Sequence, residues 1–168
     1  MTCAFDAMMY AQTIHKDQKR KYTNDHYSIH LGEVAGIVAT VDTSYKAIAT
    51  AWLHDSIEDQ GETRFSIERR FGCSVALGVH LLSDLEEGNR ATRKLLNRQR
   101  LANAPGWVQT IKVADLISNT RSIVKHDPKF AVTYLEEKRL LLSCLRKADK
   151  GLWREAWDLA SLWITHES

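Results

Sequence analysis

Two histidines and two aspartates in this chain could together hold one divalent metal ion. His54 and Asp55 are adjacent, while His30 lies upstream and Asp115 downstream. Two imidazole nitrogens with two carboxylates suit Mn²⁺, Fe²⁺, Co²⁺ or Zn²⁺ better than a metal that prefers thiolates. A metal held in this way lowers the pKa of bound water and screens the charge of a phosphoryl group. The set therefore indicates hydrolytic chemistry on a phosphorylated substrate.

Each of these residues also has an ordinary structural interpretation. A His-Asp dipeptide occurs often by chance, His30 could be a hydrogen-bonded core histidine, and Asp115 could be solvated or paired in a salt bridge. The combination is more specific than its members, because Lys112 and Asn119 stand at i−3 and i+4 from Asp115 and share its helical face. We therefore favour the metal site over the separate structural roles.

Charged residues follow the His-Asp doublet and precede His30. Glu58 and Asp59 would add two carboxylates near the metal, although helix ends also collect charge and the pair could be the polar end of a helix. Upstream, Arg20 and Lys21 belong to a short basic cluster. Arg20 offers a planar fork for phosphate and Lys21 a point charge. The alternative is a solvated loop, which the metal motif elsewhere in the chain makes less attractive.

Composition restricts the class of protein. The 168 residues are enough for one domain over 1–168, and 23 basic against 21 acidic residues give a net charge of only +2. This balance predicts neither nucleic-acid nor membrane binding. The basic run from Arg90 to Arg100 lacks interleaved aromatic residues and is typical of a solvated helix face. Three isolated cysteines, no apolar run near ~18 residues and no signal peptide predict a cytoplasmic protein.

Apolar residues recur at three- and four-residue spacing, which predicts an all-α protein with one compact helical domain. The motif-bearing core covers about 4–147, and a C-terminal helix of about 150–165 carries Trp153, Trp157 and Trp163. We expect these tryptophans to pack on the core, and self-association into a homo-oligomer is the alternative. The expected helices cover about 4–16, a segment from Ile29 to Val41, Tyr45 into the His-Asp doublet, Thr63 to Gly72, 74–84, 90–103, 107–125 and 128–147. Capping residues mark three of the starts, namely Asp42-Thr-Ser44, Thr63, and Asp127 before Pro128.

Five motifs follow one another along the chain. They are Gln18-Lys-Arg-Lys21, Tyr27-Ser-Ile-His-Leu-Gly-Glu-Val-Ala35, Leu53-His-Asp-Ser-Ile-Glu-Asp59 with Thr63, Phe71-Gly-Cys-Ser-Val-Ala76, and Gln109-Thr-Ile-Lys-Val-Ala-Asp-Leu-Ile-Ser-Asn119. In this order they resemble the hydrolase domain of RelA/SpoT-type proteins. They cover most of residues 4–147, and the ordered set is far more specific than any one of them. The similarity is to the small, stand-alone alarmone hydrolases, which have the HD-domain helical fold without an attached synthetase.

The resemblance implies a substrate, a cofactor and roles for particular residues. Proteins of this kind use Mn²⁺ to remove the 3′-pyrophosphate from guanosine tetra- or pentaphosphate. The metal ligands would be His30, His54, Asp55 and Asp115. The acidic pair Glu58 and Asp59 would position or deprotonate the attacking water. The nucleotide contacts would be Arg20, Lys21, Asn119 and Tyr134.

The chain departs from the family pattern beside the nucleotide pocket. It has His30-Leu31 where the family usually has His-Pro, and Asn24-Asp-His-Tyr27 where a Gly-x-Pro-Tyr turn is usual. Neither change touches the ligand set, so hydrolysis is still expected, while the base and exact substrate stay open. The alternatives are an adenosine-type alarmone, NADPH or a deoxynucleoside triphosphate as substrate, or a non-catalytic nucleotide sensor.

Overall fold

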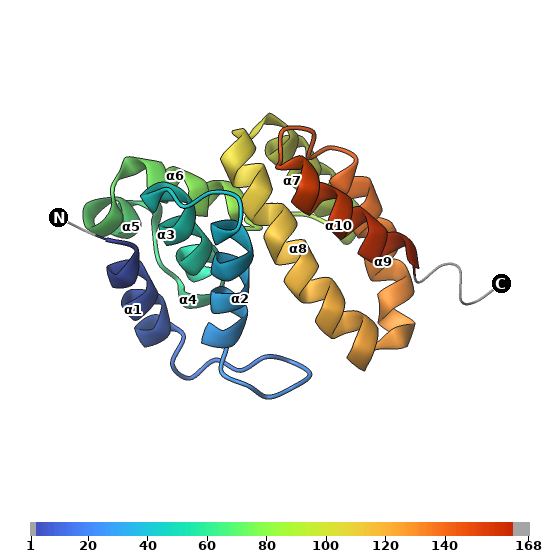
Figure 1. Cartoon of the computed structure of the whole chain (residues 1–168), viewed down its shortest axis with the longest axis horizontal. Helices are drawn as coiled ribbons and strands as arrows, with labels where there is room; N and C mark the ends of the chain where they lie inside the picture. Colours follow the sequence, from blue (N-terminus) through green and yellow to red (C-terminus); the bar gives the residue numbers. More distant parts are fainter. Residues whose placement is uncertain (1–2, 163–168) are drawn as a thin grey trace. The chain divides into compact units, whose positions relative to one another are not determined.

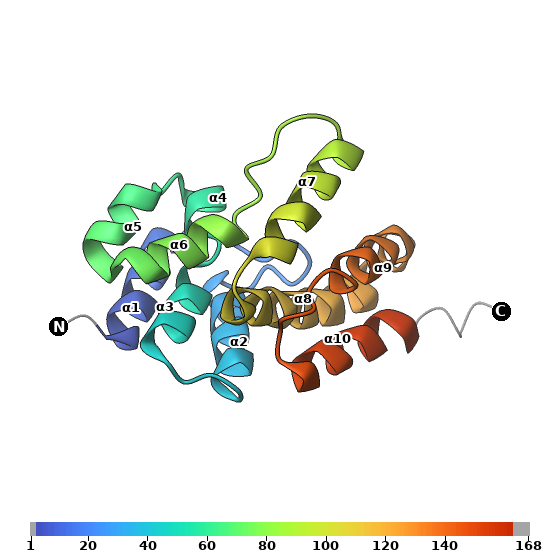
Figure 2. The same ribbon diagram turned by 90° about the horizontal axis from the view of Figure 1, so that it is seen from above.

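The computed structural model describes residues 3–162, and helices dominate this part of the chain (Figures 1 and 2). The all-α fold class is confirmed, since no strand occurs among the described residues and only Lys19 and His26 form an isolated bridge. The chain divides into two compact units, Met1–Glu86 and Glu87–Ser168. The expected single domain over 1–168 stays a prediction. Within residues 3–162, no helix has both the length and the apolar character to cross a membrane.

The first unit is organised around one short helix of small side chains. Its central helix packs against α1, α2 and α6. Alanines at three of its buried positions allow this close packing, and a Cβ on Gly32 would lie only 3.2 Å from the Trp52 ring. The helices of this unit are α1 (Ala4–Ile14), α2 (Ser28–Ala39), α3 (Tyr45–Leu53, the central one), α4 (Ser56–Gln60), α5 (Arg64–Phe71) and α6 (Cys73–Leu82).

The second unit is built on one long helix. Eleven residues of α8 are buried, and α8 packs against α9 and α10, which also contact each other. The helices of this unit are α7 (Arg90–Asn103), α8 (Gly106–His126), α9 (Pro128–Leu142) and α10 (Lys150–Leu162).

A buried glutamine joins three segments of the second unit. The Gln109 side-chain nitrogen donates to the carbonyl oxygen of Leu101 at 2.9 Å and also lies within 3.3 Å of the Ala104 oxygen. The Gln109 side-chain oxygen accepts the backbone N–H of Lys147 at 2.8 Å. One fully buried amide therefore satisfies backbone groups at the end of α7 and in the turn after α9, and this fixes where α8 begins.

Helix starts agree well with the sequence. The side chains of Ser44 and Thr63 accept the amides of Ala47 and Ser66, and so cap α3 and α5 as expected. Asp127 caps α9, and Pro128 occupies its first turn. The range predicted for α7, 90–103, is the observed one.

Two predicted helix ends are wrong, each for a tertiary reason. The helix expected to run into the His-Asp doublet ends at Leu53, because a His54 ring nitrogen lies 2.8 Å from the Ala51 carbonyl oxygen that a continuing helix would use. Glu58 and Asp59 consequently lie on the separate helix α4, not at the end of α3.

The helix predicted to reach about residue 147 ends at Leu142. The Leu142 carbonyl accepts the indole N–H of Trp153 at 2.8 Å, and the Ser143 carbonyl accepts Arg146 Nε at 2.7 Å. These side chains replace the amides that would continue the helix. Trp153 and Trp157 are partly buried and stack on each other at 5.2 Å. The expected end of the last helix, with Trp163, lies outside the described residues.

The start of α8 depends on a glycine, which gives a stability prediction. A Cβ on Gly106 would lie 2.6 Å from the carbonyl oxygen of Lys147, so the backbone must shift to accept a side chain. We expect Gly106→Ala to lower the free energy of unfolding by about 1–3 kcal/mol, measured by urea denaturation. Gly36→Ala in α2 is the control, because nothing lies within 4 Å of its added Cβ. That variant should be as stable as the wild type or more stable. Equal stability of Gly106→Ala and the wild type would contradict the close approach.

Candidate metal centre

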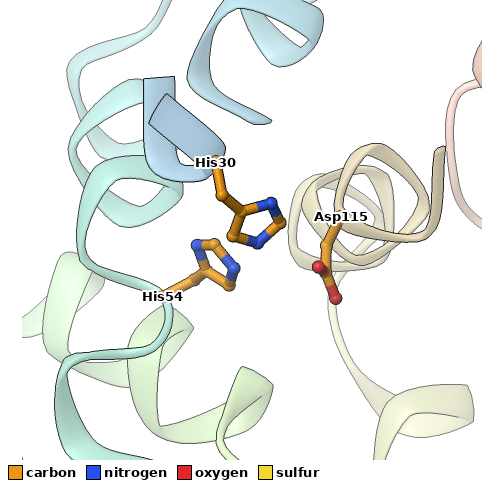
Figure 3. Close-up of side chains that lie close together, drawn as sticks. All are labelled: His30, His54 and Asp115. Carbon is orange, nitrogen blue, oxygen red and sulfur yellow. The ribbon is translucent and has the colours of Figure 1, made fainter. Parts of the chain in front are cut away.

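Two buried histidines of the first unit present ring nitrogens to each other. His30 lies in the first turn of α2 and His54 directly after α3, and both are at most 2% exposed. Figure 3 shows the two rings close together, with centroids 5.3 Å apart and planes inclined by 65°. One ligand nitrogen of each ring lies within 4.8 Å of the other. The packing of α2 on α3 therefore brings together two of the predicted ligands.

A carboxylate oxygen of Asp55 completes this cluster in the first unit. Asp55 Oδ2 is 3.0 Å from His54 Nε2 and 3.7 Å from His30 Nε2. The same oxygen accepts the hydroxyl of Tyr27 at 2.7 Å. A single oxygen thus lies against two imidazole nitrogens and one O–H donor.

The donor set fits a divalent cation. His54 Nδ1 is 2.8 Å from the carbonyl oxygen of Ala51, to which it can only donate. A neutral His54 ring then carries a lone pair on Nε2, which faces the Asp55 oxygen at 3.0 Å. Two electron-rich atoms at that separation repel unless a proton or a metal cation lies between them. Two ligands at right angles, each about 2.1 Å from one metal ion, are also about 3 Å apart.

The second unit presents Asp115 with both oxygens held by its own helix. Lys112 Nζ lies 2.9 Å from Asp115 Oδ2, and Asn119 Nδ2 donates to Oδ1 at 2.6 Å. The predicted sharing of one helical face at i−3 and i+4 is confirmed. Figure 3 shows the Asp115 carboxylate projecting from α8. The role of this carboxylate as a ligand beside the two histidines belongs to the proposed function.

Tyr134 also lies in the second unit, on α9, and it is only 6% exposed. Burial, together with the negative charge of Asp115, raises the pKa of the Tyr134 hydroxyl well above its ordinary value, so this group stays protonated. Asn119 is partly buried. The resemblance to RelA/SpoT-type proteins implies that both residues contact the nucleotide, and that role remains a prediction.

Glu58 and Asp59 are both exposed on α4. A carboxylate oxygen of Glu58 accepts the backbone N–H of Asp84 at 2.9 Å. Asp59 Oδ2 accepts a hydrogen bond from Gln18 Nε2 at 2.8 Å. Each acid is therefore held by a partner from a distant segment of the first unit while remaining open to solvent.

The basic residues lie in a tight loop between α1 and α2. Arg20 pairs with Glu33 at 2.9 Å, and Lys21 Nζ lies 4.9 Å from the centroid of the Tyr22 ring. Asn24 has a left-handed backbone with φ of 59°. Asparagine tolerates that conformation better than most residues, so it can replace the glycine usual in the related turn.

Sequence reasoning missed the partners that hold these acids. Tyr27 was named in the sequence analysis only as part of a motif and was given no role, although it stands one helical turn before His30. Its ring lies edge-on to that of His30, with centroids 5.3 Å apart, and its hydroxyl reaches Asp55. Gln18 forms a hydrogen bond with Asp59, 41 positions away in the sequence, and no local sequence pattern predicts such a pair.

A comparison with known families decides the assignment. The family described as "HD domain" matches residues 7–142, well over half of the chain. The chain belongs to the HD domain family. In this structure the His54-Asp55 doublet lies beside His30.

Curated relatives of the HD chain carry alarmone-related names. The guanosine-3′,5′-bis(diphosphate) 3′-pyrophosphohydrolase of Haemophilus influenzae is 32% identical over 121 residues, which are 68% of this chain and 18% of that protein. A probable enzyme of the same name from Synechocystis is 28% identical over 162 residues, 93% of this chain and 21% of that protein. The GTP pyrophosphokinase rsh of Brucella melitensis is 32% identical over 123 residues, 70% of this chain and 16% of that protein. The chain thus spans about one fifth or less of these relatives.

A solved structure described as a metazoan ortholog of SpoT, which hydrolyzes ppGpp and plays a role in starvation responses, has the same fold. The TM-score is 0.85 with 23% sequence identity, and the match covers 93% of this chain and 92% of that one. The helical HD fold expected from the motifs is confirmed. The names of the relatives likewise confirm the resemblance to RelA/SpoT-type proteins.

The Tyr27 hydroxyl should tune metal binding through Asp55. We expect Tyr27→Phe to weaken the affinity for Mn²⁺ by about 10–100-fold, as is typical when a hydrogen-bond partner of a ligand is lost. The measurement is isothermal titration of the purified chain with Mn²⁺. Tyr45→Phe is the matched control, since the Tyr45 hydroxyl bonds the carbonyl of Phe71 instead. Similar Mn²⁺ affinities for the two variants would contradict the role given to Tyr27.

Proposed function

We propose that this chain is a metal-dependent phosphohydrolase that removes the 3′-diphosphate of guanosine tetra- or pentaphosphate. The observation that carries the proposal is the Asp55 oxygen lying against Nε2 of two buried histidines, 3.0 Å from His54 and 3.7 Å from His30. This donor set belongs to a chain of the HD domain family. The metal ligands in this proposal are His30, His54, Asp55 and Asp115.

The relatives' names support hydrolysis more than synthesis. One of them is called a GTP pyrophosphokinase, but this chain covers 16% of it. The solved structure that matches over 92% of its own length is described as hydrolyzing ppGpp. A buried pair of histidines beside a carboxylate can bind a metal ion that assists hydrolysis. We therefore propose pyrophosphate and GDP or GTP as products.

The proposed metal is Mn²⁺. Imidazole and carboxylate ligands bind this ion and also Fe²⁺, Co²⁺ and Zn²⁺. When bound, such an ion supplies an acidified water and neutralises phosphoryl charge. Both histidines are buried, and the Ala51 carbonyl additionally fixes the orientation of the His54 ring.

The reaction needs a proton acceptor for the attacking water and cationic side chains that bind the phosphates of the substrate. Water attacks the phosphorus attached to the 3′-oxygen, the bond between this phosphorus and that oxygen breaks, and the 3′-oxygen takes up a proton. In the proposal Glu58 and Asp59 orient the water and accept its proton, and both are exposed to solvent. Arg20 and Lys21 bind phosphate oxygens. For Arg20, a phosphate would compete with Glu33, its present partner at 2.9 Å.

Asn119 and Tyr134 are the proposed contacts to the nucleoside. Asn119 is partly buried and already donates a hydrogen bond to Asp115. The Tyr134 hydroxyl keeps its proton because burial raises its pKa. It could therefore donate a hydrogen bond to a ribose or base oxygen at any physiological pH.

Another nucleotide is the second candidate substrate. The loop between Arg20 and Tyr27 carries the departures from the family pattern, including His26, whose Nε2 lies 3.2 Å from Lys19 Nζ. An adenosine-type alarmone, NADPH or a deoxynucleoside triphosphate would use the same metal and acids. A non-catalytic sensor would not need exposed acids beside the doublet. We also propose a cytoplasmic location, supported by the free thiols of Cys3, Cys73 and Cys144.

Product analysis by anion-exchange chromatography tests the function. The purified chain with Mn²⁺ is incubated with guanosine tetraphosphate, its adenosine analogue, NADPH and dATP, beside an Asp55→Ala control. We expect metal-dependent release of GDP and pyrophosphate from guanosine tetraphosphate, and none with the control or after chelation. Preferential turnover of another substrate would support the second candidate. No turnover of any compound, with Mn²⁺ demonstrably bound, would overturn the enzymatic proposal.

The acidic pair can be tested separately from metal binding. We expect Glu58→Ala to retain Mn²⁺ affinity but to lower kcat about 10²–10⁴-fold, the range for loss of general base catalysis. Steady-state kinetics with guanosine tetraphosphate give kcat, and calorimetry gives the metal affinity. Glu87→Ala, an exposed glutamate after α6, serves as the control. A kcat near the wild-type value would remove Glu58 from the mechanism.

A further inference from the structure

A buried histidine in the first unit has no role in the proposed mechanism. His15 follows α1, is 1% exposed and stacks on the Tyr27 ring at 5.4 Å with an interplanar angle of 20°. Burial lowers the pKa of His15 below its ordinary value, so the ring is neutral at physiological pH. A neutral imidazole has one N–H and one lone pair, and the neighbouring atoms decide which nitrogen carries the proton.

The hydrogen bonds around Gln18 settle this choice. His15 Nδ1 lies 2.6 Å from Gln18 Oε1, a distance that requires an N–H donor on the histidine. Gln60 Nε2 donates to the same oxygen at 2.6 Å and lies farther from His15 Nδ1, at 3.2 Å. His15 Nε2 is buried and has no hydrogen-bond partner within residues 3–162, as expected for the unprotonated nitrogen.

The Asp59 carboxylate fixes which way the Gln18 amide points. A carboxylate oxygen accepts hydrogen bonds, so Gln18 Nε2 faces Asp59 Oδ2 and donates to it at 2.8 Å. The Gln18 oxygen therefore faces the other way, where it accepts hydrogen bonds from His15 and Gln60. The chain of bonds runs from buried His15 through Gln18 to an exposed carboxylate.

We propose that His15 and Gln18 are positioning residues that hold the Asp59 carboxylate in one orientation for its work on the attacking water. This inference rests on the proposed function and assigns a task to a histidine outside the ligand set. Asp59 needs such support because it lies on a helix of five residues and its side chain is exposed. With Oδ2 held by Gln18, the other oxygen of Asp59 has a defined direction.

The same glutamine also closes the base of the basic loop. The backbone N–H of Tyr27 donates to the carbonyl oxygen of Gln18 at 3.1 Å, and Arg20 N–H donates to the Asp25 carbonyl at 2.9 Å. The side chain of Gln18 therefore orients an acid while its backbone anchors the loop that carries Arg20 and Lys21. Loss of the Gln18 amide alone should affect the acid and leave the loop's backbone bond in place.

The first test removes the amide. We expect Gln18→Leu to lower kcat for guanosine tetraphosphate about 10–100-fold, with KM and Mn²⁺ affinity within about threefold of the wild type. Gln12→Leu is the matched control, since Gln12 is exposed on α1 and should keep full activity. Melting curves show whether each variant is folded. A folded Gln18→Leu with wild-type kcat would overturn the inference.

The second test uses the position of the histidine N–H. Asparagine carries a donor near the place of Nδ1, whereas glutamine carries one nearer the place of Nε2. We expect His15→Asn to retain kcat within about threefold, and His15→Gln to lose as much as Gln18→Leu. A merely structural role would lower melting temperature and kcat together in both variants. Equal kcat values for His15→Asn and His15→Gln would contradict the proposed hydrogen-bond chain.

A double-mutant cycle with Asp59→Asn separates this inference from the proposed function. If Gln18 acts through Asp59, adding Gln18→Leu to Asp59→Asn should lower kcat no further. Multiplicative losses would overturn the inference while leaving the catalytic role of Asp59 standing. Full activity of Asp59→Asn alone would instead refute the role of Asp59 in the proposed function, and the inference with it.

Discussion

The first unit holds a carboxylate oxygen against the nitrogens of two buried histidines. Asp55 Oδ2 lies 3.0 Å from His54 Nε2, and the other nitrogen of His54 is committed to the Ala51 carbonyl. If His54 Nε2 carries a lone pair, the two atoms repel each other unless a proton or a metal cation lies between them. Here burial of both histidines and the Tyr27 hydroxyl on Asp55 oppose their separation. Because packing already holds these atoms together, a metal ion bound by them would require little reorganisation of the site.

The helices around this cluster can be understood from that requirement. Ala47, Ala49 and Ala51 let the helices around α3 approach it closely. The break after Leu53 then directs His54 inward and starts α4, which carries the acidic pair. A continuous helix from Tyr45 onward would have kept the Ala51 carbonyl in the backbone ladder and lost the bond that fixes the His54 ring. The helix end that sequence reasoning missed is thus the feature that orients one ligand.

Features encoded within a few residues were predictable from the sequence. Caps at Ser44, Thr63 and Asp127 depend on one side chain and the next turn, and all three were anticipated. The face shared by Lys112, Asp115 and Asn119 follows from helical spacing alone, and the hydrogen bonds are present. The candidate ligands on the first unit were also found, because the doublet and His30 have recognisable residue types.

Features that depend on distant partners were not predictable. The end of α9 is set by Trp153, eleven positions beyond Leu142, and by Gln109, which takes the Lys147 amide from another helix. Tertiary folding brings these groups together, so a prediction from apolar periodicity alone made this helix several residues too long. Gln18 and Asp59 are a second case, since a polar residue in a loop and an acid on a short helix each look ordinary alone.

The second unit shows how both oxygens of a buried carboxylate receive partners from its own helix. Lys112 and Asn119 occupy both oxygens of Asp115 from the same helix, and their positions are fixed once α8 forms. A buried charge needs such partners, and the Lys112 ammonium lies 2.9 Å from Asp115 Oδ2. A divalent ion could replace the lysine contact with a stronger charge, since Lys112 has a flexible side chain that can move away. Spacing along one helix therefore positions Asp115 of the proposed ligand set, whereas tertiary packing positions the two histidines. The proposed ligands of the two units are thus oriented by different kinds of interaction.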